Sequence, residues 1–417
     1  MRILLVVHKY PPESLGGTEI YTWSLARALT RAGHDVHVFY PYPGISQDEA
    51  NAEEDGVHLW RVALPTSQAS EGPIKQFWHT FRSAAVEEAF ARLLEGVRPE
   101  LVHFQHVQGV SARLIELAAG RPRIVTLHDY WYFCANSQLV RPDHQVCSGP
   151  GWGWKCVDCA TARADLSVLR LARPAVALPF AYRNRYLYRL CQQVDHFLAP
   201  SEFLRRQYIA QGFPASRITV AENGLDTARL AGTPIADLPP PPIRPHFGFL
   251  GSLAWQKGVH ILVEAFNQLP DKAALTIYGN ENAFPEYVAQ LKAAARHPYI
   301  RFAGQLDHRA VGVALRQIDC LVVPSLWYEN SPVTIQEAYA MQVPVIASRL
   351  GALEEKVQDG KTGRLFSAGS SQELAEILCQ IIEHPDQLSA LRAGIRPPLT
   401  VDEHVTKLEA IYADALS

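Results

Sequence analysis

Short apolar, β-branched segments alternate with helical patterns along nearly the whole chain, and this alternation runs twice. In the first half these segments lie at residues 2–8, 34–40, 57–63, 101–105, 123–129, 194–201 and 217–224. In the second half they lie at residues 246–252, 273–279, 299–304, 319–325, 343–348 and 363–366. Strands spaced by helices form right-handed βαβ units and a parallel sheet. The sequence therefore predicts an α/β protein with two doubly wound, Rossmann-like domains.

A proline run, DLPPPPIRP at residues 237–245, separates the two halves. Four consecutive prolines fit neither a helix interior nor a central strand, so the run is expected to be a stiff linker. We expect one domain over residues 1–236 and a second over 246–395. Residues 396–417 carry a helical pattern with no strand after it.

The helix that follows the first strand is expected to start at Thr18 as N-cap and to end near Gly33. Tyr21 and Leu25 belong to its predicted buried face, and Ser24 to its exposed face.

Charge and hydropathy exclude several classes of protein. The 39 basic and 42 acidic residues nearly cancel, which argues against a nucleic-acid partner. The apolar run before His8 is too short for a signal peptide, and no segment approaches the ~20 apolar residues of a membrane helix. We expect a cytoplasmic protein that is at most peripheral to the inner face of a membrane.

Polar and glycine residues follow the predicted strands, at the edge where ligands bind in such folds. Gly16 and Gly17 open the first helix and let backbone amides approach an anion, although the pattern is not GxGxxG. His128 and Asp129 end the fifth predicted strand, and Asn223 ends a later one. Taken alone, the glycine pair and Asn223 are also compatible with ordinary turns, and His128 with a hydrogen-bonded histidine at a strand end.

The second half carries a more specific set. Gly251 ends a strand and Lys257 precedes a helix, where an ammonium and helix-end amides can hold a diphosphate. Glu329 lies on a loop after a strand and Glu337 on the next helix, where carboxylates can accept hydrogen bonds from sugar hydroxyls. A solvated lysine and a helix-surface glutamate are the alternatives.

Together, the glycine pair, HD at 128, ENG at 222, GSL and KG from 251, and E-x7-E from Glu329 to Glu337 resemble family 4 retaining glycosyltransferases of the GT-B fold. The resemblance implies transfer from a nucleotide-diphosphate sugar donor, without a catalytic cofactor, to a glycan or lipid-linked acceptor. It also implies a tail helix that packs back on the first domain. The implied catalytic residues are His128 and Glu329. The implied donor-binding residues are Gly17, Asn223, Gly251, Lys257, Glu329 and Glu337, and the acceptor-side residues are Gly16 and Asp129.

Two positions depart from the family pattern. Many members have an arginine where this chain has Ser252, and the loop at 329–332 has the sequence ENSP where EGFG is common. A nucleotide-sugar epimerase of the same architecture is the alternative enzyme. A zinc-containing nucleic-acid-binding protein is a further alternative, which the near-neutral charge disfavours.

Four of the seven cysteines, Cys134, Cys147, Cys156 and Cys159, lie within 26 residues. They provide the number of ligands that a structural zinc ion needs, including one C-x2-C pair, with His144 in reserve. Reduced packing thiols, disulfides and an iron–sulfur cluster remain alternatives.

The segment that follows, 167–191, interleaves arginines with aromatic residues. It is compatible with contact to an anionic membrane or with a partly buried helix pair.

Overall fold

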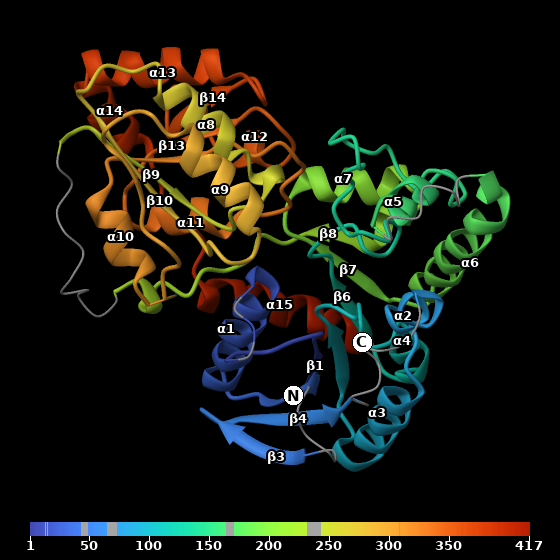
Figure 1. The fold of residues 1–417 in the computed structure, drawn as a ribbon. Helices are drawn as coiled ribbons and strands as arrows, with labels where there is room; N and C mark the ends of the chain where they lie inside the picture. The colour runs from blue at the N-terminus through green and yellow to red at the C-terminus, as the bar shows by residue number, and fades with distance from the viewer. Residues whose placement is uncertain are drawn as a thin grey trace. The chain divides into compact units, whose positions relative to one another are not determined.

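The computed structural model describes residues 1–12, 14, 16–42, 49–64, 73–163, 171–231, 243–307 and 309–417. The chain forms two compact units (Figure 1). The first contains Met1–Gly224 and Val401–Ser417, and the second contains Leu225–Thr400. Residues 237–242 of the proline run lie outside the described residues, so the linker stays a prediction.

The first unit is built on an eight-stranded sheet with the order β3-β4-β2-β1-β5-β6-β7-β8. All neighbouring strands are parallel except β3 and β4, which are antiparallel. The strands are β1 Arg2–Val6, β2 Asp35–Tyr42, β3 Glu49–Glu54, β4 Val57–Ala63, β5 Leu101–Phe104, β6 Arg123–Thr126, β7 His196–Ala199 and β8 Ile218–Val220.

Helices cover both faces of this sheet. They are α1 Gly17–Arg31, α2 Pro73–His79, α3 Ala84–Val97, α4 Leu114–Leu117, α5 Cys156–Arg163, α6 Arg173–Cys191, α7 Glu202–Ala210 and α15 Val401–Leu416. Val36 and Val38 pack with α1 and α15, whereas Phe39 contacts Phe90 of α3. Because successive strand residues point to opposite faces, a strand buried on both faces is apolar throughout.

The start of α1 differs from the prediction. Gly16, not Thr18, is the N-cap, and as a glycine it has no side chain to cap the helix. Ser24, predicted to be exposed, is buried with Leu25. Ser24 is small enough to fit against a neighbouring element. The periodicity of the helix itself does not reveal that such a neighbour covers this face.

The second unit contains a six-stranded parallel sheet with the order β11-β10-β9-β12-β13-β14. Its strands are β9 His246–Leu250, β10 Ala274–Tyr278, β11 Ile300–Phe302, β12 Cys320–Val323, β13 Val345–Ser348 and β14 Gly363–Phe366. Its helices are α8 Val259–Phe266, α9 Pro285–Ala294, α10 Val311–Gln317, α11 Val333–Ala340, α12 Leu353–Lys356, α13 Ser371–Glu383 and α14 Asp386–Gly394. Two buried cores occupy the two faces of the sheet. The prediction of two doubly wound domains is confirmed.

The last helix, α15, belongs to the first unit, where it lies beside α1 (Figure 1). The Tyr21 hydroxyl of α1 lies 2.7 Å from Nε2 of His404, and the Tyr412 hydroxyl lies 2.7 Å from Nδ1 of His103. All four side chains are buried. The chain end is therefore held to the first sheet by apolar packing and by two buried hydrogen bonds. Within the described parts of the chain, no helix combines the length and apolar character needed to cross a bilayer.

The strand orders mark one special point in each sheet. In the first sheet the order reverses between β1 and β5, and in the second between β9 and β12. In open α/β sheets, ligands bind outside the carboxyl ends of the strands at such a point.

Candidate active site

Five polar residues gather where β1, β5 and β6 end in the first unit. His8 follows β1, Gln105 and His106 follow β5, and His128 and Asp129 follow β6. Because these three strands are neighbours in one parallel sheet, their carboxyl ends meet at the same edge.

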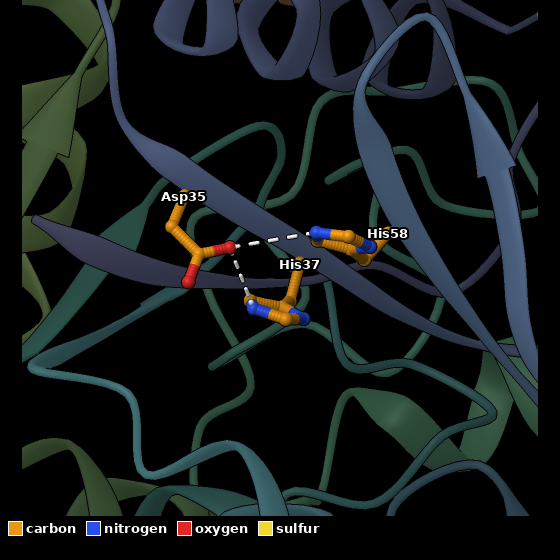
Figure 2. Close-up of side chains that lie close together, drawn as sticks. All are labelled: Asp35, His37 and His58. Atoms are coloured by element: carbon orange, nitrogen blue, oxygen red, sulfur yellow. Dashed lines mark ion pairs between the residues drawn. The ribbon is translucent and has the colours of Figure 1, made fainter.

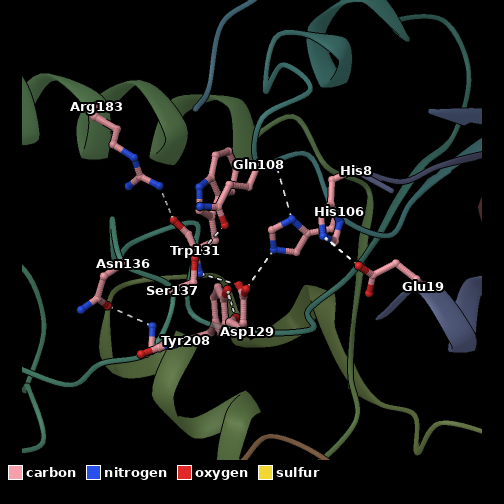
Figure 3. Close-up of polar contacts among 11 residues, drawn as sticks. His8, Glu19, His106, Gln108, Asp129, Trp131, Asn136, Ser137, Arg183 and Tyr208 are labelled. Atoms are coloured by element: carbon pink, nitrogen blue, oxygen red, sulfur yellow. Dashed lines mark hydrogen bonds and ion pairs between the residues drawn. The ribbon is translucent and has the colours of Figure 1, made fainter. Parts of the chain in front are cut away.

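Hydrogen bonds connect these residues in pairs. His128 Nε2 donates to Oε1 of Gln105 at 3.0 Å, and His106 Nε2 donates to Oδ2 of Asp129 at 2.9 Å. The ring centroids of His8 and His106 are 4.6 Å apart. Figure 3 shows both side chains together with the His106–Asp129 contact. The structure therefore joins both predicted residues, His128 and Asp129, to partners from the neighbouring strand.

Burial keeps His8 and His128 neutral. Burial, followed by the repulsion of His106 and His103, lowers the pKa of His128 well below 6.5. Burial and the neighbouring His106 likewise lower the pKa of His8 to about 2. A neutral imidazole can donate one hydrogen bond and accept another, so His128 is suited to positioning hydroxyl groups at neutral pH.

Within the part of the chain that the structure describes, two buried polar atoms of these five residues have no hydrogen-bond partner, Nδ1 of His8 and Nε2 of Gln105. Unsatisfied buried polar atoms are uncommon, and a ligand that supplies an acceptor to Gln105 and a donor to His8 would remove their desolvation cost.

Gly16 and Gly17 lie at the start of α1, as predicted, but the Glu19 side chain approaches Gly16. A Cβ atom on Gly16 would lie 2.5 Å from Oε2 of Glu19, whereas one on Gly17 would meet nothing within 4 Å. Glu19 is buried, accepts a hydrogen bond from Ser14 at 2.8 Å and lies 3.6 Å from His8. The chain's own carboxylate therefore lies where the helix start would attract an anion.

The second unit brings Lys257 and Glu329 together. Lys257 ends the 3-10 helix η5 (Trp255–Lys257) after β9, and Glu329 lies on the loop after β12. The Lys257 Nζ atom is 2.7 Å from Oε1 of Glu329. Strands β9 and β12 flank the reversal point of this sheet, so the pair occupies the position expected for a ligand site.

Three donors converge on one oxygen of Glu329. Besides Lys257, Ser325 Oγ donates at 2.7 Å and Trp327 Nε1 at 2.9 Å. Burial alone would raise the pKa of Glu329, but the Lys257 charge and these hydrogen bonds outweigh it and lower the pKa. Glu329 is therefore ionised at neutral pH, and its carboxylate acts only as an acceptor of hydrogen bonds.

Gly258 allows the two loops to approach closely. Its φ of +69° favours glycine, and a Cβ atom there would lie 1.8 Å from the carbonyl oxygen of Pro324. Only a residue without a side chain lets the Lys257 turn pack against the loop that carries Glu329.

Glu337, on α11, is paired with an arginine that the sequence analysis did not single out. Arg229, in the 3-10 helix η4 (Ala228–Leu230), contacts Oε1 of Glu337 through Nη2. Both side chains are 7% exposed. Glu337 is therefore a buried, charge-compensated carboxylate, and the alternative of a helix-surface charge is wrong.

The remaining predicted donor-site residues lie at strand ends. Gly251 follows β9 and its amide donates to the carbonyl of Tyr278 at 3.1 Å. Asn223 is buried after β8 in the first unit.

The four clustered cysteines line one pocket of about 180 Å³ in the first unit, and none forms a disulfide. A different group, Asp35, His37 and His58, is the only set of three metal-type ligands within 4.8 Å of one another among the described residues. Figure 2 shows both imidazoles facing Oδ1 of Asp35. Trp60 donates to Nδ1 of His37, so Nε2 carries the proton, and Arg2 already pairs with Asp35. Asp35 and Trp60 already give these imidazoles polar partners without a metal.

Several site residues could have been found from the sequence. His8, Gln105 and His106 follow strands in the same way as His128, and applying the strand-end rule to every strand would have included them. Arg229 had no such signal, because it follows no strand directly.

Two family models and several known proteins match this chain. Residues 15–229 match the family model described as Glycosyltransferase Family 4, and residues 244–384 match Glycosyl transferases group 1. A glycogen synthase of Mycobacterium tuberculosis is 26% identical over 96% of this chain and 91% of its own length. A phosphatidyl-myo-inositol mannosyltransferase of Mycolicibacterium smegmatis is 32% identical over 46% of this chain and 49% of its own. The crystal structure of Anabaena HepE in complex with UDP and glucose has a TM-score of 0.69 at 18% identity, covering 99% of this chain and 100% of that one.

Proposed function

The chain belongs to glycosyltransferase family 4 and has the GT-B fold, and from that premise we propose that it transfers a sugar from a nucleotide-diphosphate sugar with retention of the anomeric configuration. The observation that supports this most directly is the Lys257–Glu329 pair at the reversal point of the second sheet. A cation and an ionised carboxylate side by side match a donor whose diphosphate is anionic and whose sugar carries hydroxyl groups.

In this proposal the bound donor separates Lys257 from Glu329. The diphosphate replaces Glu329 as the partner of the Lys257 ammonium, and Glu329 accepts hydrogen bonds from the donor sugar. The bond between the anomeric carbon and the diphosphate oxygen breaks, the acceptor hydroxyl oxygen forms the new bond to that carbon, and the hydroxyl proton passes to the leaving diphosphate. As the first bond breaks, negative charge grows on the diphosphate. Lys257 stabilises that charge, which is the electrostatic contribution that lowers the barrier. Ser252 adds no charge, so Lys257 carries more of this role than where an arginine stands beside it.

Glu337 is assigned to the ribose of the nucleotide, with Arg229 holding its carboxylate in place through Oε1. Gly251 in the second unit, and Gly17 and Asn223 in the first, are the further residues that we assign to donor binding. His128 stands beside the transferred sugar as a neutral hydrogen-bonding group, and Gly16 and Asp129 belong to the acceptor side.

We assign the acceptor to the class of glycans and lipid-linked glycans. Two relatives support this range, since one is named for making glycogen and the other for mannosylating a phosphatidyl-inositol. No metal or other cofactor has a role in the transfer step of this proposal, and any zinc held by the cysteines is structural.

The first unit has a surface whose residues suit contact with the inner face of an anionic membrane. Leu178, Tyr182, Arg185 and Arg189 are exposed at the spacing of one face of α6, and Trp78 of α2 packs its ring 5.4 Å from that of Tyr182. Arginines attract anionic headgroups while tyrosine and tryptophan lie at their level. Arg183 of the same helix is buried and takes no part in this surface.

Incubating the purified protein with UDP-, GDP- and ADP-sugars, with and without glycan or lipid-linked acceptors, tests the proposal. We expect release of the nucleotide from one donor and faster release when an acceptor is present. Absence of release from every donor and acceptor pair would contradict it.

A further inference from the structure

The four clustered cysteines come from different parts of one loop and helix but line a single pocket. Cys134 lies on the loop after β6, and Cys147 follows a tight hairpin closed by the bridge between Val140 and Val146. Cys156 and Cys159 occupy the first turn of α5. Residues three apart on a helix share a face, so both α5 thiols can point the same way, and all four cysteines line the same pocket.

Two of these thiols have polar partners within the loop. Cys134 Sγ donates to Oδ1 of Asn136 at 2.8 Å, and Cys147 Sγ donates to the carbonyl oxygen of Gly149 at 3.3 Å. Cys156 and Cys159 lie at the amino end of α5, where the helix dipole favours negative charge.

An independent observation comes from Arg183, whose side chain is completely buried. Its Nη2 donates to the carbonyl of Trp131 at 2.6 Å, a contact drawn in Figure 3, and its Nη1 donates to Oδ1 of Asn184 at 3.0 Å. Among the described residues, its Nε has no hydrogen-bond partner and no carboxylate forms an ion pair with it. Cys134, Cys156 and Asp129 are near enough to interact with it electrostatically. A buried cation without a counterion is costly, so a negative charge is missing from this region.

We propose that Cys134, Cys147, Cys156 and Cys159 hold one structural zinc ion, and that Arg183 compensates part of the negative charge of this centre. Four thiolates around Zn²⁺ carry a net charge of two minus, and both Arg183 and Lys155, which lines the pocket, are positive. The ion supplies the charge that the buried guanidinium lacks, and the guanidinium lowers the cost of burying the ion.

Binding requires the thiols to converge. Sulfur atoms around tetrahedral zinc lie about 3.8 Å apart, because each Zn–S bond is about 2.3 Å. No three of the four sulfurs lie within 4.8 Å of one another in the structure described here. The pocket they share gives their side chains room to turn inward around an ion, and glycines at 149, 151 and 153 with positive φ shape the loop between them.

The decisive measurement is the metal content of the wild-type protein, purified without immobilised metal and analysed by plasma mass spectrometry. We expect about one zinc ion per chain. A protein close to metal-free, or one that carries iron with visible absorption, would overturn the proposal. Because this readout does not involve sugar transfer, it can fail while the proposed function holds, and the reverse is equally distinguishable.

Variants identify the ligands. Cys156→Ser and Cys159→Ser should each lose most of the zinc, while Cys379→Ser, on α13 of the second unit, should retain it. Zinc contents unchanged by the first two substitutions would refute the ligand set. If these variants fail to fold, titration of the wild-type thiols in the presence of a zinc-responsive dye replaces them. Release of zinc should follow thiol modification, and modification without release would count against the site.

The electrostatic role of Arg183 is tested by measuring the zinc affinity of its variants. Arg183→Met should weaken zinc binding by at least about tenfold in competition with a chelator, because it removes the compensating charge. Arg183→Lys keeps the charge and should recover part of the affinity. Equal zinc affinities of the wild type and Arg183→Met would disprove the electrostatic role.

Discussion

The Nζ atom of Lys257 lies 2.7 Å from Oε1 of Glu329, although the two residues are 72 positions apart in the chain. They meet because β9 and β12 are neighbours in the second sheet, so the loops that leave their carboxyl ends are adjacent. Gly258 completes the arrangement by letting one loop pack on the backbone of the other. The donor-site proposal rests on this contact, and the first prediction addresses it.

Lys257→Ala and Glu329→Gln should each reduce turnover by about 100-fold or more, because each removes a charge that is directed at the donor. Steady-state kinetics with the preferred donor gives the measurement. Lys292→Ala is the matched control, since Lys292 pairs with Glu281 on the surface of the same unit. Wild-type activity in either Lys257→Ala or Glu329→Gln would mean that the donor binds elsewhere.

His128→Ala should lower kcat by about 100-fold while changing the donor dissociation constant far less. The imidazole is neutral and hydrogen-bonded to Gln105, so it positions a reacting group rather than binding the diphosphate. Calorimetry of donor binding beside kinetics separates the two effects, and His384→Ala, at an exposed helix end, serves as control. A larger loss of binding than of kcat would assign His128 to the donor-binding surface.

Arg229→Ala should destabilise the protein by about 3 kcal/mol, because it leaves the Glu337 carboxylate buried without its counterion. Urea unfolding provides the free energy. The double variant Arg229→Met with Glu337→Met should regain much of that stability without regaining donor binding. A single variant as stable as the wild type would show that water already solvates Glu337.

Acidification should destabilise the first unit before its carboxylates titrate. Burial and the charge of Lys407 lower the pKa of His404 to about 4, and burial with repulsion from His404 lowers that of His103 to about 3. In the unfolded chain both titrate near 6.5. The unfolded state therefore binds more protons below pH 6.5, and stability is full above that pH and falls as pH drops toward 4.

Each of these histidines should contribute a slope of about 1.4 kcal/mol per pH unit well below pH 6.5. Unfolding free energies at pH 7.5 and 5.5 measure this slope, and His404→Gln should reduce it while His384→Ala should not. A pH-independent stability between these values would contradict the neutral, buried state of both groups.

Charge reversal on α6 should weaken membrane contact. Arg185→Glu with Arg189→Glu removes two exposed cations from the face that carries Tyr182, and each contributes about 1 kcal/mol near an anionic surface. Co-sedimentation with vesicles of mixed neutral and anionic lipids measures binding, and Arg296→Glu, exposed in the second unit, controls for net charge. Equal sedimentation of all three proteins would rule out this surface.

Much of the fold was predictable because the hydrophobic pattern of each parallel strand is local. Strands such as β1 and β9 are buried on both faces and therefore appear as continuous apolar runs. Strand β3 was missed, because EANAEE has no such run and forms a strand only by pairing with β4 at the sheet edge. The segment 167–191 was expected either to contact an anionic membrane or to form a partly buried helix pair, and the sequence did not indicate that the packing of α6 buries its Arg183 completely.

The sequence by itself determined the two-domain α/β alternation, the family, and the strand-end positions of His128, Lys257 and Glu329, because periodicity and motif spacing involve only neighbouring residues. Only the tertiary structure decided which of these residues meet. The order of strands in each sheet sets the pairing of Lys257 with Glu329 and of His128 with Gln105, and helix packing within the second unit brings Arg229 to Glu337. That order depends on packing between distant segments, and no local pattern encodes it.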